Sequence, residues 1–331
     1  MRRTLVLTLG LALFLVAPGF AAETLSLYDN FNSSSLINYT KWTGSASDVL
    51  ETYKYIIKVS TDPAPVDREL FLAARGYGLR TGATVNDYRR ANNRLRFRRL
   101  DPNVIRAIKA TVKVNSALAV GCPTAGSDIT QSRLRLGGYF FNDGTGEPGR
   151  VTGDVEARID IRRLSNSTVA NQLNVRAVVW RCIDDAQCLL THTLFNQTLG
   201  TILVGNTATV LLQWDPATNR FLFQLNTLPV VSYTYTVPDA APPQNFFDKK
   251  YIDIGHHIAN CVASQTQAFM SANVDDVYVN TAAALATAAP KAQAGVAPVT
   301  EGFPEREPNI PEPDDLGGVI EPEPSLREVD E

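Results

Sequence analysis

Histidine and cysteine are scarce in this sequence of 331 residues, and their scarcity limits the kinds of site it can build. There are three histidines, and His256 and His257 are adjacent, so in a strand they would point to opposite faces and could not share a metal ion. None of the four cysteines stands in a Cys-x-x-Cys spacing, which argues against a zinc site. The absence of a Gly-x-Ser-x-Gly motif excludes a serine nucleophile elbow.

Long apolar runs are also missing, with one exception at the start of the chain. Two arginines precede the apolar segment 5–16, and small residues follow up to Ala22. This layout is typical of a cleavable export signal, which we place at residues 1–21, with cleavage after Ala21. No cysteine stands at the boundary, so a lipid anchor is not expected, and no later run is long enough for a membrane span. We therefore expect a secreted or periplasmic protein, with a signal of bacterial appearance.

Charge of either sign is modest in the folded part. The formal net charge is −3, but residues 301–331 hold eleven acids and two arginines, whereas residues 22–300 hold 27 basic and 23 acidic residues. Neither part is extreme enough to predict a nucleic-acid partner.

The C-terminal segment 283–331 is rich in alanine, proline and acids and poor in aromatics. Such a composition buries too little apolar surface to offset the entropy lost on ordering, so we predict a disordered tail. A spacer or docking tail and a merely solubilising terminus are both consistent with it.

Two-residue alternation of polar and apolar side chains dominates residues 22–282. It is longest in Asp154–Arg162, and short β-branched runs separated by Gly, Asn, Asp and Pro predict strands elsewhere. Helical turns are expected only near 48–55 or 67–74. The predicted strands also include 93–98, 110–114, 132–136, 174–181, 189–194, 207–214, 220–225, 230–237, 251–254 and 274–279.

The segment 207–225 is a predicted hairpin, because Asp215-Pro-Ala-Thr-Asn219 suits a turn between two strand-like runs. Ten or more short strands at this spacing predict an all-β fold of two antiparallel sheets packed as a sandwich. The aromatic candidates for its core are Phe97, Trp180, Trp214, Phe221 and Phe223.

Export to an oxidising compartment predicts paired cysteines. Cys182 and Cys188 bracket a polar loop and are the expected first pair, which leaves Cys122 with Cys261. The second bridge would close a long loop and could contribute roughly 4–5 kcal/mol.

Three segments resemble the concanavalin A-like lectin/glucanase jelly roll over residues 25–281. They are the opening 27–31 with Lys41-Trp42, the 214–223 hairpin, and the closing Asn273-Val-Asp-Asp-Val-Tyr-Val279. The resemblance implies a jelly-roll domain at 22–282. That fold is shared by lectins, hydrolases, lyases and inert spacers, so it does not by itself identify a function.

Hydrolases of this fold place two carboxyls on one strand face in a Glu-x-Asp-x-Glu pattern. Here Glu156 and Asp160 occupy the outer positions, but Arg158 stands between them and favours their charged forms, which opposes a general-acid role. The alternative is a cross-strand charge ladder with Arg133, Arg135 or Arg176 as partners, formed of exposed pairs that each contribute little.

A structural calcium ion is a further possibility, because Asp29 in the first strand could meet Asp275 or Asp276 in the last. The simpler alternative is that these aspartates cap turns. No other cofactor is expected.

A sugar could lie against Tyr139, with Asn142 and Asp143 as polar partners. The simpler alternative for this loop is a hairpin turn.

Three hypotheses follow. The first is a non-catalytic lectin-like module that binds polysaccharide or glycan. The second is a polysaccharide-active enzyme, either hydrolase or lyase, using Glu156 and Asp160. The third is a structural cell-surface or periplasmic protein.

Overall fold

Strands account for nearly all regular structure in the computed structural model. It describes residues 23–47, 51–59, 66–80, 88–98, 104–123, 129–147, 149–184, 188, 190–244 and 250–282, so the predicted export signal and tail lie outside it. No helix among these residues is long and apolar enough to cross a membrane. The elements are β1 (Leu25–Asp29), β2 (Trp42–Ser47), β3 (Glu51–Lys58), β4 (Arg68–Tyr77), β5 (Tyr88–Phe97), β6 (Ala107–Val120), β7 (Gln131–Asn142), β8 (Asp154–Leu164), β9 (Gln172–Cys182), β10 (Thr191–Leu203), β11 (Thr207–Asp215), the 3₁₀ turn η1 (Pro216–Thr218), β12 (Arg220–Leu225), β13 (Val231–Thr234), β14 (Lys250–Ala259) and β15 (Gln267–Asn280).

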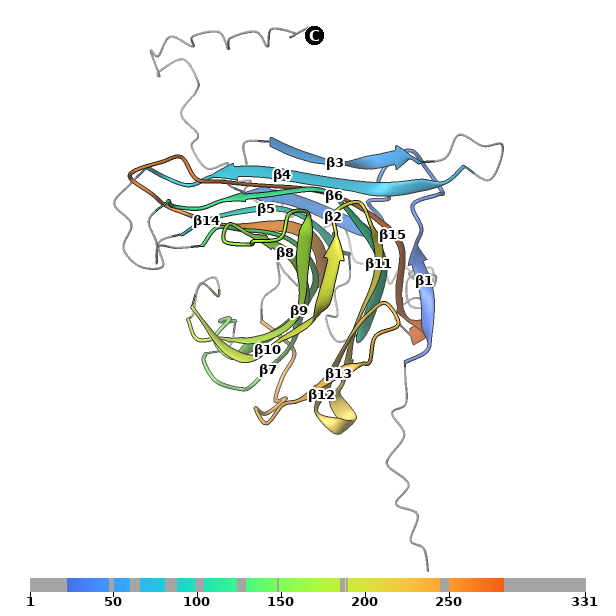
Figure 1. The fold of residues 1–331 in the computed structure, drawn as a ribbon. Coiled ribbons are helices and arrows are strands. Elements are labelled where there is room, and N and C mark those ends of the chain that lie inside the picture. Colours follow the sequence, from blue (N-terminus) through green and yellow to red (C-terminus); the bar gives the residue numbers. More distant parts are fainter. Residues whose placement is uncertain are drawn as a thin grey trace, which may run out of the picture. The chain divides into compact units, whose positions relative to one another are not determined.

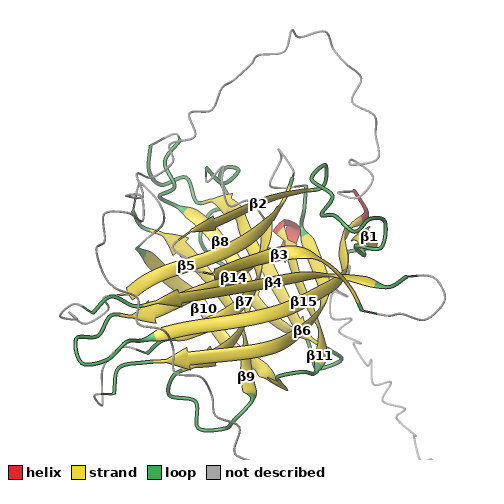
Figure 2. Cartoon of the chain, turned by 90° about the horizontal axis from the view of Figure 1, so that it is seen from above, coloured by secondary structure: helices red, strands yellow, loops and turns green. Residues whose placement is uncertain are grey.

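These strands form two antiparallel sheets that face each other (Figures 1 and 2). The eight-stranded sheet has the order β13-β12-β11-β6-β15-β4-β3, with β1 also paired to β15, and the seven-stranded sheet has the order β10-β9-β8-β7-β14-β5-β2. The predicted all-β sandwich of antiparallel sheets is confirmed.

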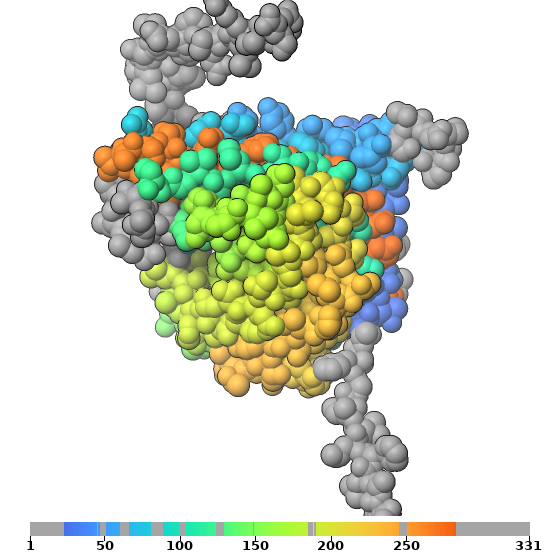
Figure 3. Space-filling view, viewed as in Figure 1, coloured from blue at the N-terminus to red at the C-terminus, as the bar shows by residue number. Residues whose placement is uncertain are grey.

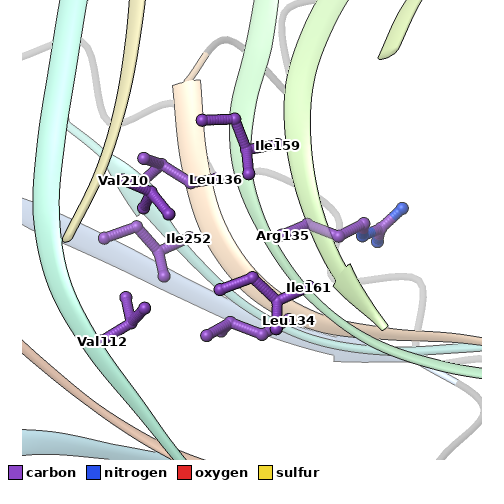
Figure 4. A pocket seen from close by; sticks show the side chains of 8 residues that line it. All are labelled: Val112, Leu134, Arg135, Leu136, Ile159, Ile161, Val210 and Ile252. Carbon is purple, nitrogen blue, oxygen red and sulfur yellow. The ribbon is translucent and has the colours of Figure 1, made fainter. Parts of the chain in front are cut away.

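The core lies between the sheets, because each strand turns alternate side chains inward. Figure 4 shows a small gap in this core, where apolar side chains of both sheets meet and the Arg135 guanidinium points away from them. Arg135 is the one polar residue among the described residues that line the gap, so the gap is packing space and not a polar binding site. Its apolar lining is Val112, Leu134, Leu136, Ile159, Ile161, Val210 and Ile252.

The predicted hairpin is confirmed as β11–η1–β12. The Asp215 carboxylate accepts the Ala217 N–H at 3.1 Å, and Asn219 adopts the left-handed conformation that ends the turn. At this end of the sandwich Phe195 of β10 stacks on Phe223, with ring centroids 6.0 Å apart. Figure 3 shows the yellow-green strands of one sheet abutting the gold strands of the other here.

Four of the five predicted aromatic core residues are buried in the core, namely Phe97, Trp214, Phe221 and Phe223. Trp180 is the exception: it is only partly buried and lies on the opposite face of its sheet. The inward residues of β9 are odd-numbered, from Leu173 to Val179, and Trp180 falls out of that phase.

The predicted helical turns near 48–55 and 67–74 are wrong where the structure describes them. Residues 51–58 form β3 and residues 68–77 form β4, and the two strands pair along their whole length. Tertiary pairing overrides the weak local preference, because cross-strand contacts stabilise aromatic and β-branched residues such as those of β3.

The disulfide between Cys182 and Cys188 is present. The second predicted disulfide is not formed in the structure, where Cys122 and Cys261 both remain thiols, and a hydrogen bond with Cys122 lowers the pKa of Cys261. The Cys122 thiol instead donates to the Asn260 carbonyl at 3.3 Å, which requires its hydrogen.

Candidate functional site on the outer face of the seven-stranded sheet

The outer face of the seven-stranded sheet is the side turned away from the core, and Figure 1 shows that the curvature of β9 and β10 makes it concave. Alternation in β8 sends Glu156, Arg158 and Asp160 to this face. Cross-strand register then places Arg135 of β7 and Arg176 of β9 beside Asp160. A layer of charged side chains, called here the ionic layer, therefore covers the outer face. From alternation alone, this face would be expected to be open to solvent.

Arg158 lies at the centre of this layer. Its Nε donates to Asp160 Oδ1 at 2.7 Å, and its Nη1 lies 3.3 Å from both oxygens of Glu156. Arg176 donates to Asp160 Oδ2 at 3.0 Å, and the Tyr251 hydroxyl donates to Glu156. The predicted ladder partner Arg176 is thus confirmed, but Asp160 is fully buried, so these are not exposed pairs.

A second group of ion pairs forms around Asp253 of β14. Arg135 reaches both carboxylate oxygens, at 2.7 and 2.6 Å, and Arg94 Nε donates at 2.8 Å. The Arg94 guanidinium also lies 4.3 Å from the centroid of the Tyr251 ring. Tyr251 therefore links the Asp253 group to the Glu156 group across the sheet.

Two glycines make room for these arginines to lie flat. A Cβ on Gly255 would lie 2.2–2.4 Å from the guanidinium of Arg135, and one on Gly137 would lie 2.4 Å from the Cβ of Arg158. Both contacts are too close for any larger residue, so the dense ionic layer depends on glycine at these positions.

The electrostatics oppose acid catalysis at this layer. The pKa of Asp160 lies well below its ordinary value because Arg158 first, and then Arg176, favour its charged form against burial. Arg135 and Arg94 lower the pKa of Asp253 in the same way. Burial raises the pKa of Tyr251, so its hydroxyl keeps its proton. The Asp160 carboxyl cannot supply a proton near neutral pH, and Glu156 is held by Arg158 and Tyr251.

Trp180 lies on top of the ionic layer. The Arg158 guanidinium carbon is 3.7 Å from the centroid of the Trp180 ring, which is a close cation–π contact. Trp180 is opposite Glu156 in the register and is partly exposed. The ring is therefore a fixed aromatic surface beside charged and polar groups.

At the other end of β8 the charge is not balanced. Arg133 and Arg162 are directly opposite each other in the register, and neither forms an ion pair with a carboxylate among the described residues. Arg133 is 1 % exposed, and its one hydrogen bond there runs from Nε to the Gly255 carbonyl at 3.0 Å. Burial first, and then the Arg135 cation, lower the pKa of Arg133.

The polar side chains of the predicted sugar-binding loop are already engaged in hydrogen bonds within the protein. Asn142 donates to Asp154 Oδ1 at 2.8 Å, and Asp143 accepts from Thr145 and from Arg181 Nη1, the latter at 3.1 Å. Tyr139 is buried against the Cys182–Cys188 disulfide. The three residues lie near one another, but the polar groups of Asn142 and Asp143 already stabilise the turn.

The predicted calcium ligands do not form one set. Terminal strands β1 and β15 do pair, but Asp29 is buried and accepts the Trp42 indole N–H at 2.7 Å, with Lys41 at 3.7 Å. Asp275 and Asp276 lie in an irregular part of β15, and burial raises the pKa of Asp275 to about 6. Among the described residues, no group of three or more His, Cys or acidic side chains could hold a metal ion.

His256 and His257 are consecutive in β14 and therefore point to opposite faces. His256 is buried in the sandwich with Nε2 3.0 Å from the Ala74 carbonyl, and its Nδ1 has no partner in the described part of the chain. Burial lowers the pKa of His256 to about 4, so its ring is neutral at neutral pH.

The sequence analysis missed Trp180 and Arg162 as site residues, and it assigned Arg133 to the charge ladder, whereas Arg133 forms no ion pair with a carboxylate among the described residues. A signal for each was available, because Trp180 and Arg162 fall on the polar phase of β9 and β8, and Arg133 falls on that of β7. The alternation pattern could not predict which of the arginines form an ion pair with a carboxylate.

Comparisons with protein-family models and with curated proteins give no match. Among solved structures, the carbohydrate recognition domain of Emp46p shares 11% identity over 76% of this chain and 95% of its own, with a TM-score of 0.29. The Bacillus licheniformis beta-glucanase shares 12% identity over 78% of this chain and 99% of its own, with a TM-score of 0.31. The kappa-carrageenase of Pseudoalteromonas carrageenovora shares 10% identity over 80% of this chain and 99% of its own, with a TM-score of 0.34. These matches single out no family.

Proposed function

We propose that this protein binds a glycan on the concave outer face of its seven-stranded sheet and does not cleave it. The observation that carries the proposal is the fixed position of Trp180 over Arg158, 3.7 Å from ring centroid to guanidinium carbon. A partly exposed aromatic ring beside polar groups suits the apolar face and the hydroxyls of a sugar.

The ion pairs beneath Trp180 support this function by keeping the surface rigid. Arg158 contacts Glu156, Asp160 and Trp180 at once, so the indole is held by a group that is itself fixed on two sides. A surface that is already ordered loses little side-chain entropy on binding, and this favours affinity.

The lowered pKa of Asp160 supports binding without cleavage, since glycoside hydrolysis requires one carboxyl that is still protonated. Export to the periplasm or the extracellular space is part of the proposal, and the disulfide is compatible with it. A polysaccharide would be met in those compartments.

The test is a binding screen of the mature protein on immobilised polysaccharides, with Trp180→Ala as the main variant. We expect wild-type binding that falls at least about tenfold in Trp180→Ala, a loss of about 1.4 kcal/mol. Trp180→Phe should keep most of the affinity, because it retains an aromatic face. Tyr53→Ala is the matched control, since Tyr53 is 49% exposed on β3 of the other sheet.

Two results would overturn the proposal. One is the absence of binding to any polysaccharide in the screen. The other is the release of reducing sugar ends by the wild type with loss of that activity in Glu156→Gln, which would make the face an active site.

A further inference from the structure

The arginines of the outer face outnumber the carboxylates that hold them. Asp160 is shared by Arg158 and Arg176, and Asp253 is shared by Arg94 and Arg135. Each carboxylate thus already serves two cations. Arg133 and Arg162 are left at one end of the face, with no carboxylate partner among the described residues.

Arg133 and Arg162 are opposite each other on the paired strands β7 and β8. Like charges in directly opposed positions destabilise a sheet, and a buried charge without a counter-ion destabilises it further. Arg133 is 1 % exposed, so water solvates its charge poorly. An anion between the two guanidinium groups would remove both penalties.

Arg162 also lacks hydrogen-bond partners for part of its guanidinium group among the described residues. Its Nε is buried and has no hydrogen-bond partner in the described part of the chain. Burial first, and then the Arg176 cation, lower the pKa of Arg162 to about 10. A guanidinium with unused donors is suited to two parallel hydrogen bonds with a carboxylate or a sulfate.

We propose that the Arg133–Arg162 pair is an anion subsite of the glycan-binding face, and that the ligand is an acidic polysaccharide bearing carboxylate or sulfate groups. This inference rests on the proposed function, and it names the substrate class of the same face.

The distance between Trp180 and the anion subsite indicates that the ligand is a polymer. Trp180 and Asn174 lie six residues apart on β9, and Asn174 is opposite Arg162 in the register. Six residues of strand span about 20 Å. One sugar could not contact Trp180 and the anion subsite together, whereas an oligosaccharide along β9 could.

The experiment compares three immobilised ligands: a polyuronate, a sulfated polysaccharide and a neutral β-glucan. We expect the wild type to bind an acidic ligand at least about tenfold more tightly than the neutral one. That preference should weaken between about 0.1 and 1 M NaCl, over which the Debye length falls from about 10 to about 3 Å. The uronate and sulfate arms distinguish the two possible anions.

Arg162→Gln should lower the affinity for the acidic ligand about tenfold and leave neutral-ligand binding unchanged. Arg106→Gln is the matched control, because it removes the same charge from an exposed position just before β6 in the other sheet. Arg133→Gln should act like Arg162→Gln. If Arg133→Gln does not fold, the half-buried Arg162 still decides the matter.

Equal binding of neutral and acidic ligands, with no effect of Arg162→Gln, would overturn this inference and leave the proposed function intact. Equal retention of single-stranded DNA would also overturn it, since the face would then attract any polyanion. Failure to bind any glycan would instead remove the proposed function itself.

Discussion

The two ends of the outer face use the same residue type in opposite ways. Around Asp160 and Asp253, arginines are held by carboxylates at 2.6–3.4 Å. Around Arg133 and Arg162, arginines face each other without a carboxylate among the described residues. The first end is a self-contained ionic layer, whereas the second is a charge imbalance that folding alone does not explain.

The difference teaches which arginines serve the fold and which serve a ligand. Removing one partner of a buried ion pair leaves an uncompensated charge and is strongly destabilising. Removing an arginine that has no partner leaves no charge behind. Stability measurements can therefore assign each arginine to a role before any ligand is known.

The largest effect is expected at the paired end. Arg158→Met leaves Glu156 and Asp160 with less compensation and should lower the free energy of unfolding by about 3–5 kcal/mol. Urea unfolding followed by tryptophan fluorescence measures it. A loss below about 1 kcal/mol would show that the layer is not cooperative.

The next effect is a pH dependence caused mainly by the burial of His256, to which the nearby cations of Arg133 and Arg135 add. An unfolded histidine titrates near 6.5, whereas buried His256 titrates at about 4. As the pH falls from 6.5 to 4, the unfolded chain gains a proton that the folded chain does not, so the free energy of unfolding should fall by about 3 kcal/mol.

His256→Gln should remove only the part of the measured slope that His256 causes, about 3 kcal/mol over this range, while keeping a donor for the Ala74 carbonyl. Unfolding curves at several pH values between 4 and 6.5 test it. His257, whose pKa burial also lowers, accounts for a remaining slope of the same sign. An unchanged slope in His256→Gln would show that His256 does not titrate as its burial requires.

The disulfide should contribute less than the ion pairs. Replacing Cys182 and Cys188 by alanine opens a short loop and should lower the free energy of unfolding by about 2 kcal/mol. Cys182 follows Trp180 by two residues, so this change should also lower glycan affinity. The fall should be smaller than in Trp180→Ala, because the indole ring is still present. Calorimetric unfolding and a binding isotherm on one preparation test both statements, and a larger loss of affinity than in Trp180→Ala would contradict the second.

The smallest effect, with the opposite sign, is expected at the unpaired end. Arg133→Met removes a buried cation that pairs with no carboxylate in the part of the chain that the structure describes. Stability should therefore stay level or rise by up to about 2 kcal/mol, after loss of one hydrogen bond to Gly255. Thermal unfolding measures it. A clear loss of stability would show that Arg133 has a structural role.

Much of the fold could be predicted from two-residue alternation, most clearly in β8 and in the β11–β12 hairpin. Local pattern could not reveal that β14 lies between β5 and β7, since those pairings join segments far apart in the chain. Asp253 and Arg94 therefore could not be assigned to the site beforehand. Trp180 could have been placed correctly, because its phase in β9 is opposite to that of Val175 and Val179.

The most direct test of the two-ended face is a single set of urea unfolding curves for wild type, Arg158→Met and Arg133→Met at neutral pH. Our account predicts that Arg158→Met unfolds at much lower urea than wild type, while Arg133→Met unfolds at the same or higher urea. Similar large losses of stability in both variants would contradict it, because the arginines would then share one structural role.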